Sequence, residues 1–203
     1  MRKLHFYSGL TLAIFIGFHL LNHLMSLAGP DSHIQFMDTL RVVYRHPIIE
    51  GLLLLAVAIQ IFSGLQMYWP LRKAKFDFWY TLKIRTGLYM AFFFLLHVAA
   101  VLGGRSLMQL DTNLYFGAAG LNDFPLLLFF VPYYGLAIFS FFGHIAALHC
   151  QRMRMVIFGL NATQQARIIL GLGGLMVVVL MYGLTGGFQG LEIPKEYGVM
   201  VGE

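Results

Sequence analysis

The sequence contains few charged residues and almost no cysteine. Of its 203 residues only 9 are Asp or Glu and 14 are Lys or Arg, whereas 59% are hydrophobic. A soluble domain of this size needs a charged surface, which so few charges cannot supply. The single cysteine, Cys150, excludes an intramolecular disulfide and a cysteine-ligated cluster within the chain. The apolar surface of the folded chain must therefore face an apolar environment, and a lipid bilayer fits this requirement.

Five long apolar stretches are each long enough to cross a bilayer. The hydrocarbon layer takes about 20 residues of helix, and backbone groups in lipid must be hydrogen-bonded within their own segment. We therefore predict a single all-α membrane domain over residues 1–203. The predicted spans are residues 4–28, 47–69, 86–104, 124–151 and 168–191. The apolar side chains of the connection 105–123 indicate a loop that lies on the membrane surface.

Most of the basic residues lie in three places: before the first predicted span, between the second and third, and between the fourth and fifth. The positive-inside rule places these segments in the cytoplasm. We therefore expect a cytoplasmic N-terminus and, after five spans, a C-terminus outside. This distribution explains the net charge of +5 by membrane orientation, and we expect no nucleic-acid partner. The basic loops are also suited to anionic lipid headgroups.

Histidines within the predicted spans are the main functional candidates, because ionisable side chains are costly inside a membrane. A helical rise of about 1.5 Å per residue places His19 roughly 13 Å below the outer end of the first span and His97 roughly 10 Å below that of the third. Two imidazoles at one depth are suited to bind a haem iron from its two faces. His23 lies one turn beyond His19 and would reach a haem propionate. Alternatively, each histidine bonds to a carbonyl or hydroxyl group of a neighbouring helix.

A second, inner pair of ligands is incomplete. His144 lies roughly 10 Å above the inner end of the fourth predicted span. The position at matching depth on the second span is Gln60, and a neutral amide is not a usual haem ligand. We therefore predict one b-type haem rather than two, with His144 as a possible ligand of the second.

The sequence resembles the five-span, haem-binding cytochrome b membrane anchor of bacterial succinate dehydrogenases and fumarate reductases. The stretches that carry the resemblance are FHLLNHL at 18–24, GP at 29–30, IIE at 48–50 and QIFSGL at 60–65. In this family, helices one and three ligate the outer haem and helices two and four the inner one. The matching positions here are His19 with His97, and Gln60 with His144; Gln60 departs from the family pattern.

The resemblance implies a non-catalytic subunit in the bacterial inner membrane. Such a subunit binds b-type haem, exchanges electrons with a quinone, and holds a flavoprotein and an iron–sulfur subunit at the cytoplasmic face. The basic inner loops would contact these partners. Gln60 leaves open an alternative, a haem-poor or haem-free anchor that only tethers a soluble redox complex. A transporter is less consistent with the sequence, because there is no repeat and Glu50 is the only charged residue within the predicted spans.

Glu50 is the candidate for proton transfer at a quinone site. It lies at the start of the second predicted span, on the same outer side as the proposed haem. Oxidation of a quinol releases protons, which require an acceptor within hydrogen-bonding distance. Arg45 and His46 precede Glu50 and would orient a quinone carbonyl or a haem propionate. Alternatively, Glu50 caps its helix or pairs with Arg45 or Arg105.

Overall fold

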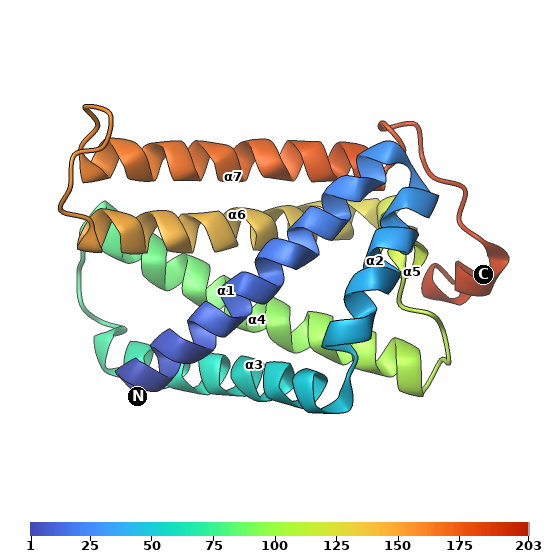
Figure 1. Ribbon diagram of the computed structural model, residues 1–203, viewed down its shortest axis with the longest axis horizontal. Coiled ribbons are helices and arrows are strands. Elements are labelled where there is room, and N and C mark those ends of the chain that lie inside the picture. The colour runs from blue at the N-terminus through green and yellow to red at the C-terminus, as the bar shows by residue number, and fades with distance from the viewer. Residues whose placement is uncertain (203) are drawn as a thin grey trace.

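Five long helices extend between the two ends of the molecule and form a bundle (Figure 1). The computed structural model describes residues 1–202. The long helices are α1 (Arg2–Leu24), α3 (Pro47–Tyr68), α4 (Phe78–Ser106), α6 (Leu127–Arg152) and α7 (Ala162–Leu184). Each, with any short 3₁₀ turn that continues it, is long and apolar enough to cross a membrane. The predicted all-α architecture with five candidate spans is confirmed, and the chain is a multi-pass membrane protein.

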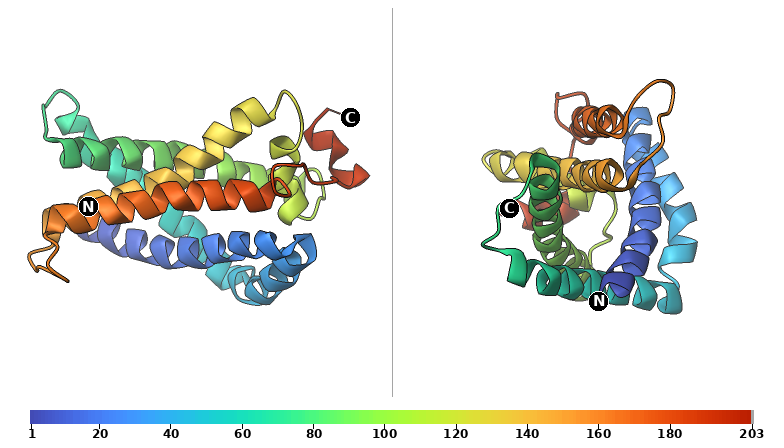
Figure 2. Two further views of the ribbon diagram at one scale, coloured as in Figure 1. Left: turned by 90° about the horizontal axis from the view of Figure 1, so that it is seen from above. Right: turned by 90° about the vertical axis from the view of Figure 1, so that its left-hand side faces the viewer.

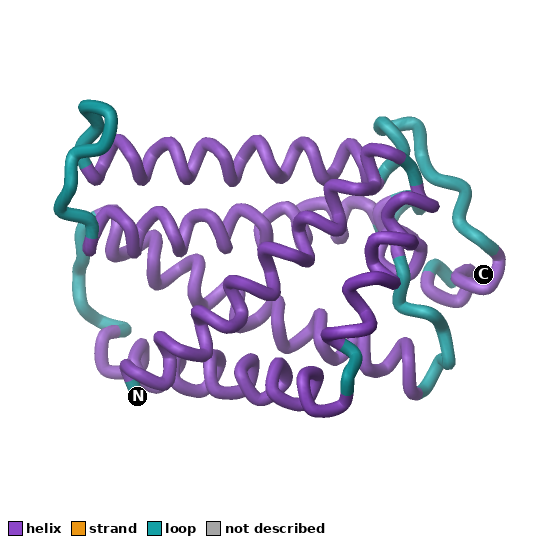
Figure 3. The backbone as a smooth tube through the Cα atoms, in the orientation of Figure 1, coloured by secondary structure: helices purple, strands orange, loops and turns teal. Residues whose placement is uncertain are grey.

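Shorter helical segments connect the long helices. They are η1 (Met25–Ala28), α2 (Pro30–Tyr44), η2 (Trp69–Leu71), α5 (Leu114–Ala118), η3 (Ala119–Leu121) and η4 (Lys195–Met200). Over residues 1–202 the backbone consists of helices and loops, with no strand (Figure 3). The N- and C-termini lie at opposite ends of the bundle, as an odd number of spans requires. We call these the N-terminal end and the C-terminal end.

The long helices form a closed ring. In chain order, α1 packs on α3, α3 on α4, α4 on α6 and α6 on α7, and α7 returns to α1. The view from the N-terminal end shows the five helices around a common centre (Figure 2, right). Since α1 and α4 are not neighbours in this ring, side chains that they direct inward meet across its centre.

The last helix differs from its predicted span at both ends. It begins at Ala162 rather than 168, because a capping box starts it there: the Asn161 side chain accepts a hydrogen bond from the Gln164 backbone amide, and the Gln164 side chain accepts one from the Asn161 backbone amide. It ends at Leu184 rather than 191. Gly186 and Gly187, with φ of 57° and 70°, turn the chain out of the helix. Apolar composition alone gave the wrong boundaries, because caps and glycines determine them.

Part of the connection 105–123, which was predicted to lie on the membrane surface, packs against the end of α7. Its apolar side chains Leu114 and Leu121 are 1% and 3% exposed and pack against Met181 and Leu184 of α7. Asn122 donates a hydrogen bond to the Leu184 carbonyl (3.0 Å) and accepts one from the Leu191 amide (2.8 Å). The connection therefore closes the C-terminal end of the bundle, because burying these apolar groups is more favourable than exposing them.

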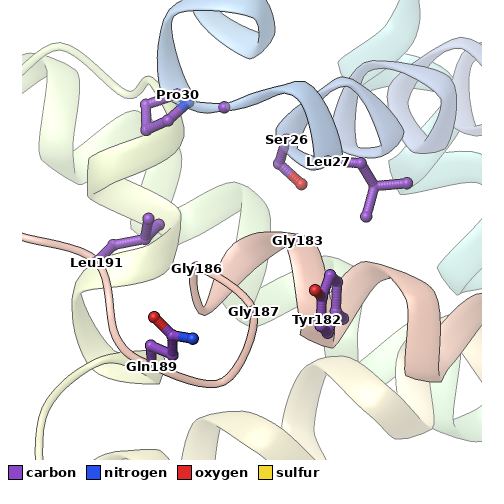
Figure 4. A pocket seen from close by; sticks show the side chains of 10 residues that line it. Ser26, Leu27, Pro30, Tyr182, Gly183, Gly186, Gly187, Gln189 and Leu191 are labelled. Atoms are coloured by element: carbon purple, nitrogen blue, oxygen red, sulfur yellow. The ribbon is translucent and has the colours of Figure 1, made fainter.

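Close packing of α7 against η1 depends on Gly183. A Cβ atom at this position would overlap with Ser26 Oγ and lie 3.3 Å from the Leu27 amide nitrogen. Figure 4 shows Ser26 and Leu27 beside Gly183, at the edge of a pocket of about 280 Å³. Small residues allow helix backbones to approach closely in membrane proteins. The contact fixes η1, which begins two residues after His23.

We expect Gly183→Ala to destabilise the protein. Overpacking costs about 1–3 kcal/mol, whereas the better helix propensity of alanine returns at most about 1 kcal/mol. Gly174→Ala, on the same helix with nothing within 4 Å of the added Cβ, is the matched control and should be neutral or stabilising. Thermal unfolding in detergent measures both variants. Equal midpoints would show that η1 moves aside at no cost.

Candidate functional site

His19 and His97 meet across the centre of the helix ring. His19 lies on α1 and His97 on α4, and their ring centroids are 6.1 Å apart with an interplanar angle of 66°. A metal–imidazole bond is about 2 Å long. When two imidazoles bind one iron from opposite sides, their ring centroids are separated by two such bonds plus the distance from each bound nitrogen to the centre of its ring. This separation is on the order of 6 Å. The predicted pair is therefore close in space, at a separation that suits two ligands of one iron.

Aromatic side chains one turn before each histidine fix the orientation of both rings. Phe15 stacks on His19 with centroids 5.8 Å apart, and Phe93 stacks on His97 at 5.0 Å. In both cases the planes are nearly parallel, at 15° and 13°. The spacing of four residues places each phenylalanine on the same helix face as its histidine. The local sequence thus limits ring rotation and surrounds the pair with apolar groups.

A chain of imidazoles continues from this pair toward α2. His23 Nε2 lies 3.2 Å from His19 Nε2, and His23 Nδ1 lies 3.3 Å from His33 Nε2. His33 is 1% exposed and also lies 3.1 Å from the Asn22 amide nitrogen. The structure therefore brings together the predicted His19, His23 and His97 and adds His33, which the sequence analysis missed. The helical spacing of the buried residues His33 and Met37, after Gly29-Pro30, is the signal for an inward-facing helix.

The polar groups around His33 are not all satisfied. His33 Nδ1 and Asn22 Oδ1 are buried without a hydrogen-bond partner. Burial, with repulsion from His19 and Arg41, lowers the pKa of His33 from 6.5 to about 4. The ring is thus held in its neutral form in the folded protein near pH 7, where one nitrogen donates and the other accepts.

The inner pair is not assembled. Gln60 accepts a hydrogen bond from Ser8 (2.7 Å), and its amide nitrogen lies 3.2 Å from His5 Nε2. His144 Nδ1 instead lies 3.0 Å from the Lys83 carbonyl oxygen and 3.4 Å from Thr86 Oγ1. Each side chain therefore has partners other than its proposed counterpart. For His144 this matches the alternative in which an intramembrane histidine bonds to a neighbouring helix.

Glu50 forms an ion pair with Arg105, which links the start of α3 to the end of α4. Both guanidinium nitrogens contact the carboxylate, with Arg105 Nη2 at 3.3 Å from Glu50 Oε2. This is one of the structural roles considered for Glu50. His46 occupies the N-cap position of α3 and is exposed. Glu50 and His46 belong to the C-terminal end of the bundle, while the pair His19–His97 lies within it.

Arg45 belongs to a separate cluster at the same end. It donates to Thr112 Oγ1 at 2.9 Å and lies 3.7 Å from Asp111, whose carboxylate is bound more closely by Arg41 at 2.7 Å. Burial, with the charges of Arg41 and Arg105, lowers the pKa of Arg45. Arg45 thus interacts with the Asp111 carboxylate more weakly than Arg41 does, and its positive charge is the less well neutralised of the two.

The geometry suits a cofactor held by two axial side chains better than a bare metal ion. Within residues 1–202 no three His, Cys, Asp or Glu side chains are arranged to hold a metal ion. A haem needs only two protein ligands on opposite faces, and His19 and His97 come from opposite sides of the ring of helices. His19 and His97 therefore fit the two-ligand requirement of a haem. Gln60 and His144 do not fit a second one.

Comparison of the chain with protein-family profiles, with curated proteins and with solved structures finds no match. The resemblance to succinate dehydrogenase and fumarate reductase anchors therefore depends on the short stretches quoted above and on the positions of the histidines.

Proposed function

We propose that the chain is the membrane subunit of an electron-transfer complex and holds one b-type haem between His19 and His97. The observation that carries this proposal is the 6.1 Å approach of the two rings from helices that do not neighbour each other in the bundle. The stacked Phe15 and Phe93 support it, because they hold the rings in place.

A bound haem would supply one-electron redox chemistry at the centre of the bundle. His19 and His97 would hold its iron. His23, one turn beyond His19, would donate a hydrogen bond to a propionate in place of its contact with His19. Phe15 and Phe93 make the immediate surroundings of the pair apolar, which favours electron transfer over binding of small polar ligands.

The direct test is a reduced-minus-oxidised absorbance spectrum of the purified chain, with iron counted per polypeptide. The expected result is a b-type spectrum and one haem iron per chain. A protein that was produced with ample haem and shows no such spectrum would overturn the proposal. Two irons per chain would show that His144 has a ligand partner other than Gln60.

A haem-free anchor is the second candidate. The observation that favours it is the 3.2 Å contact between His19 Nε2 and His23 Nε2, which already gives the proposed ligand atom a polar partner. In that case the histidines would serve only as interhelical contacts. The same spectrum and iron count distinguish the two candidates.

The resemblance also supports a location and partners. We propose that the chain resides in the bacterial inner membrane with its N-terminus in the cytoplasm, where a flavoprotein and an iron–sulfur subunit bind. The basic residues of the 72–85 and 152–167 segments support this orientation, since most of the Lys and Arg residues are on that side. At the opposite end, a quinone would exchange electrons with the haem.

Glu50→Gln tests the quinone part of the proposal. If Glu50 releases Arg105 and accepts a proton from a quinol, the variant should lose quinol-driven reduction of the protein several-fold, with the resting spectrum intact. Asp38→Asn is the matched control, because Asp38 also pairs with an arginine at this end but is exposed. Stopped-flow absorbance with a quinol analogue measures the rate. Equal rates for both variants would leave Glu50 as a structural ion pair only.

A further inference from the structure

The loop between α6 and α7 carries four consecutive apolar residues at its tip. Met155, Val156, Ile157 and Phe158 are 67%, 65%, 39% and 98% exposed. The loop folds as a short hairpin, in which Ile157 and Leu160 exchange two backbone hydrogen bonds of 3.2 and 2.9 Å. Burial of apolar surface drives folding, so a fully exposed phenylalanine on an ordered turn requires an explanation.

The hairpin is held in place by hydrogen bonds from the buried side chain of Gln165. Gln165, only 9% exposed, donates to the carbonyls of Met155 (3.1 Å) and Leu160 (2.7 Å). Its own oxygen accepts from His149 Nε2 at 2.8 Å. Both polar atoms of the Gln165 side chain are thus used, in three hydrogen bonds, and the two sides of the hairpin are fixed to the first turn of α7.

The tip also contains backbone strain. Phe158 has φ of +49° and Gly159 φ of +75°, the combination of a two-residue hairpin turn that favours Asn-Gly or Gly-Gly. A bulky residue with positive φ is an outlier, and such strain gathers at functional positions. The chain therefore adopts an unfavourable conformation that directs an aromatic side chain away from the protein.

The surroundings of the tip match an anionic lipid surface. Arg152 and Arg154 precede it, Arg167 follows it, and all three are exposed. Between Asp123 and Glu192 the sequence contains no acidic residue, and within residues 1–202 none of the three arginines has an acidic partner. Basic residues beside exposed apolar ones are typical of segments that lie in the membrane interface.

The position of the hairpin in the molecule is also consistent with contact with a lipid surface. It lies at the N-terminal end, displaced sideways beside the first turns of α7 (Figures 1 and 2). The continuous apolar part of α7 begins at Ile168, about 9 Å along the helix from Ala162. The headgroup region on each side of a bilayer is on the order of 5–8 Å thick. With the hydrocarbon layer beginning at Ile168, the hairpin would lie at the depth of the headgroups.

We propose that the Met155–Phe158 tip inserts into the lipid leaflet at the N-terminal end of the bundle, where Arg152, Arg154 and Arg167 bind phosphate groups of anionic phospholipids. The tip fixes the depth of α6 and α7 in the bilayer. This role does not depend on haem binding.

Spin-label accessibility tests the insertion. The single native cysteine is removed as Cys150→Ser, and Phe158→Cys or Val156→Cys is labelled with a nitroxide; the second variant leaves Phe158 in place. Lys73→Cys, in the exposed loop between α3 and α4 at the same end, is the matched control. The proteins are reconstituted in phosphatidylethanolamine–phosphatidylglycerol vesicles. Collision rates with oxygen and with a water-soluble nickel chelate are then measured.

The ratio of oxygen to nickel collisions should be several-fold higher at positions 158 and 156 than at position 73, because oxygen concentrates in lipid and the chelate in water. Equal ratios at all three positions would overturn the proposal. The apolar tip would then be free in water in the purified protein and available to a soluble protein partner instead.

Discussion

His97→Ala is expected to abolish the b-type absorbance spectrum of the purified protein while the chain still inserts into the membrane. His97 would be one of the two side chains that hold the haem iron, and alanine has no group that can bind it. His19→Ala should have the same effect. His97 lies within a long apolar helix whose insertion does not depend on it. The absorbance spectrum reports haem, and the yield of folded protein in the membrane fraction reports insertion.

His144→Ala is the matched control for this experiment. It is another intramembrane histidine, but it contacts Lys83 and Thr86 rather than the His19–His97 pair, so its removal should leave the spectrum unchanged. If His144→Ala removes the haem and His97→Ala does not, the site has been assigned to the wrong histidines.

His23→Ala should shift the absorbance spectrum or the reduction potential of the haem without eliminating the haem. Complete loss in His23→Ala would instead make His23 the ligand on α1.

The similar depth of His19 and His97 could be predicted from the sequence because depth depends on helix geometry alone. A constant rise per residue gives the depth of a side chain once the ends of an apolar span are roughly known. An error of a few residues at the ends changes both depths only slightly. The boundaries of α4 did differ, since Asp77 accepts a bond from the Tyr80 amide and starts the helix well before residue 86. The relative depth of the two histidines was little affected.

His33 could not be found in this way because α2 is not a membrane span. Polar and charged side chains interrupt its apolar ones throughout, so a search for long apolar stretches passes over it. The burial of His33 follows from how α2 folds back against α1 and η1, which is a tertiary contact. For the same reason the sequence did not reveal that Gln60 is bound by His5 and Ser8. Depth alone does not specify which way a side chain points around its helix.

The partner of Glu50 was also undetermined by sequence. Arg45 is nearer in the chain, and Arg105 is remote, yet Arg105 is the residue that binds the carboxylate. Arg45 lies just before α3 and turns toward Thr112 and Asp111. The choice depends on the way the connection after α4 folds over the C-terminal end, and apolar packing of that connection determines its path.

The wild-type protein is expected to lose stability as the pH falls from about 6.5 to 4, in part because of His33. Burial lowers the pKa of His33 from 6.5 to about 4, so between these values the unfolded chain binds a proton and the folded chain does not. Stability therefore rises with pH across this window and levels off above it. The difference between the two pKa values corresponds to on the order of 3 kcal/mol of unfolding free energy. Denaturation in mixed micelles at a series of pH values measures this dependence.

His33→Gln should flatten the pH dependence, because glutamine keeps a polar side chain beside Asn22 but does not titrate. The comparison uses the slope of stability against pH rather than its value at one pH, since the substitution also changes packing at a buried position. His46→Gln, at an exposed histidine near the same end, is the control for the histidine-to-glutamine change itself. Parallel curves for the wild type and His33→Gln would contradict the prediction. The acid sensitivity would then belong to the histidines within the spans, and the neutral ring of His33 would contribute nothing to it.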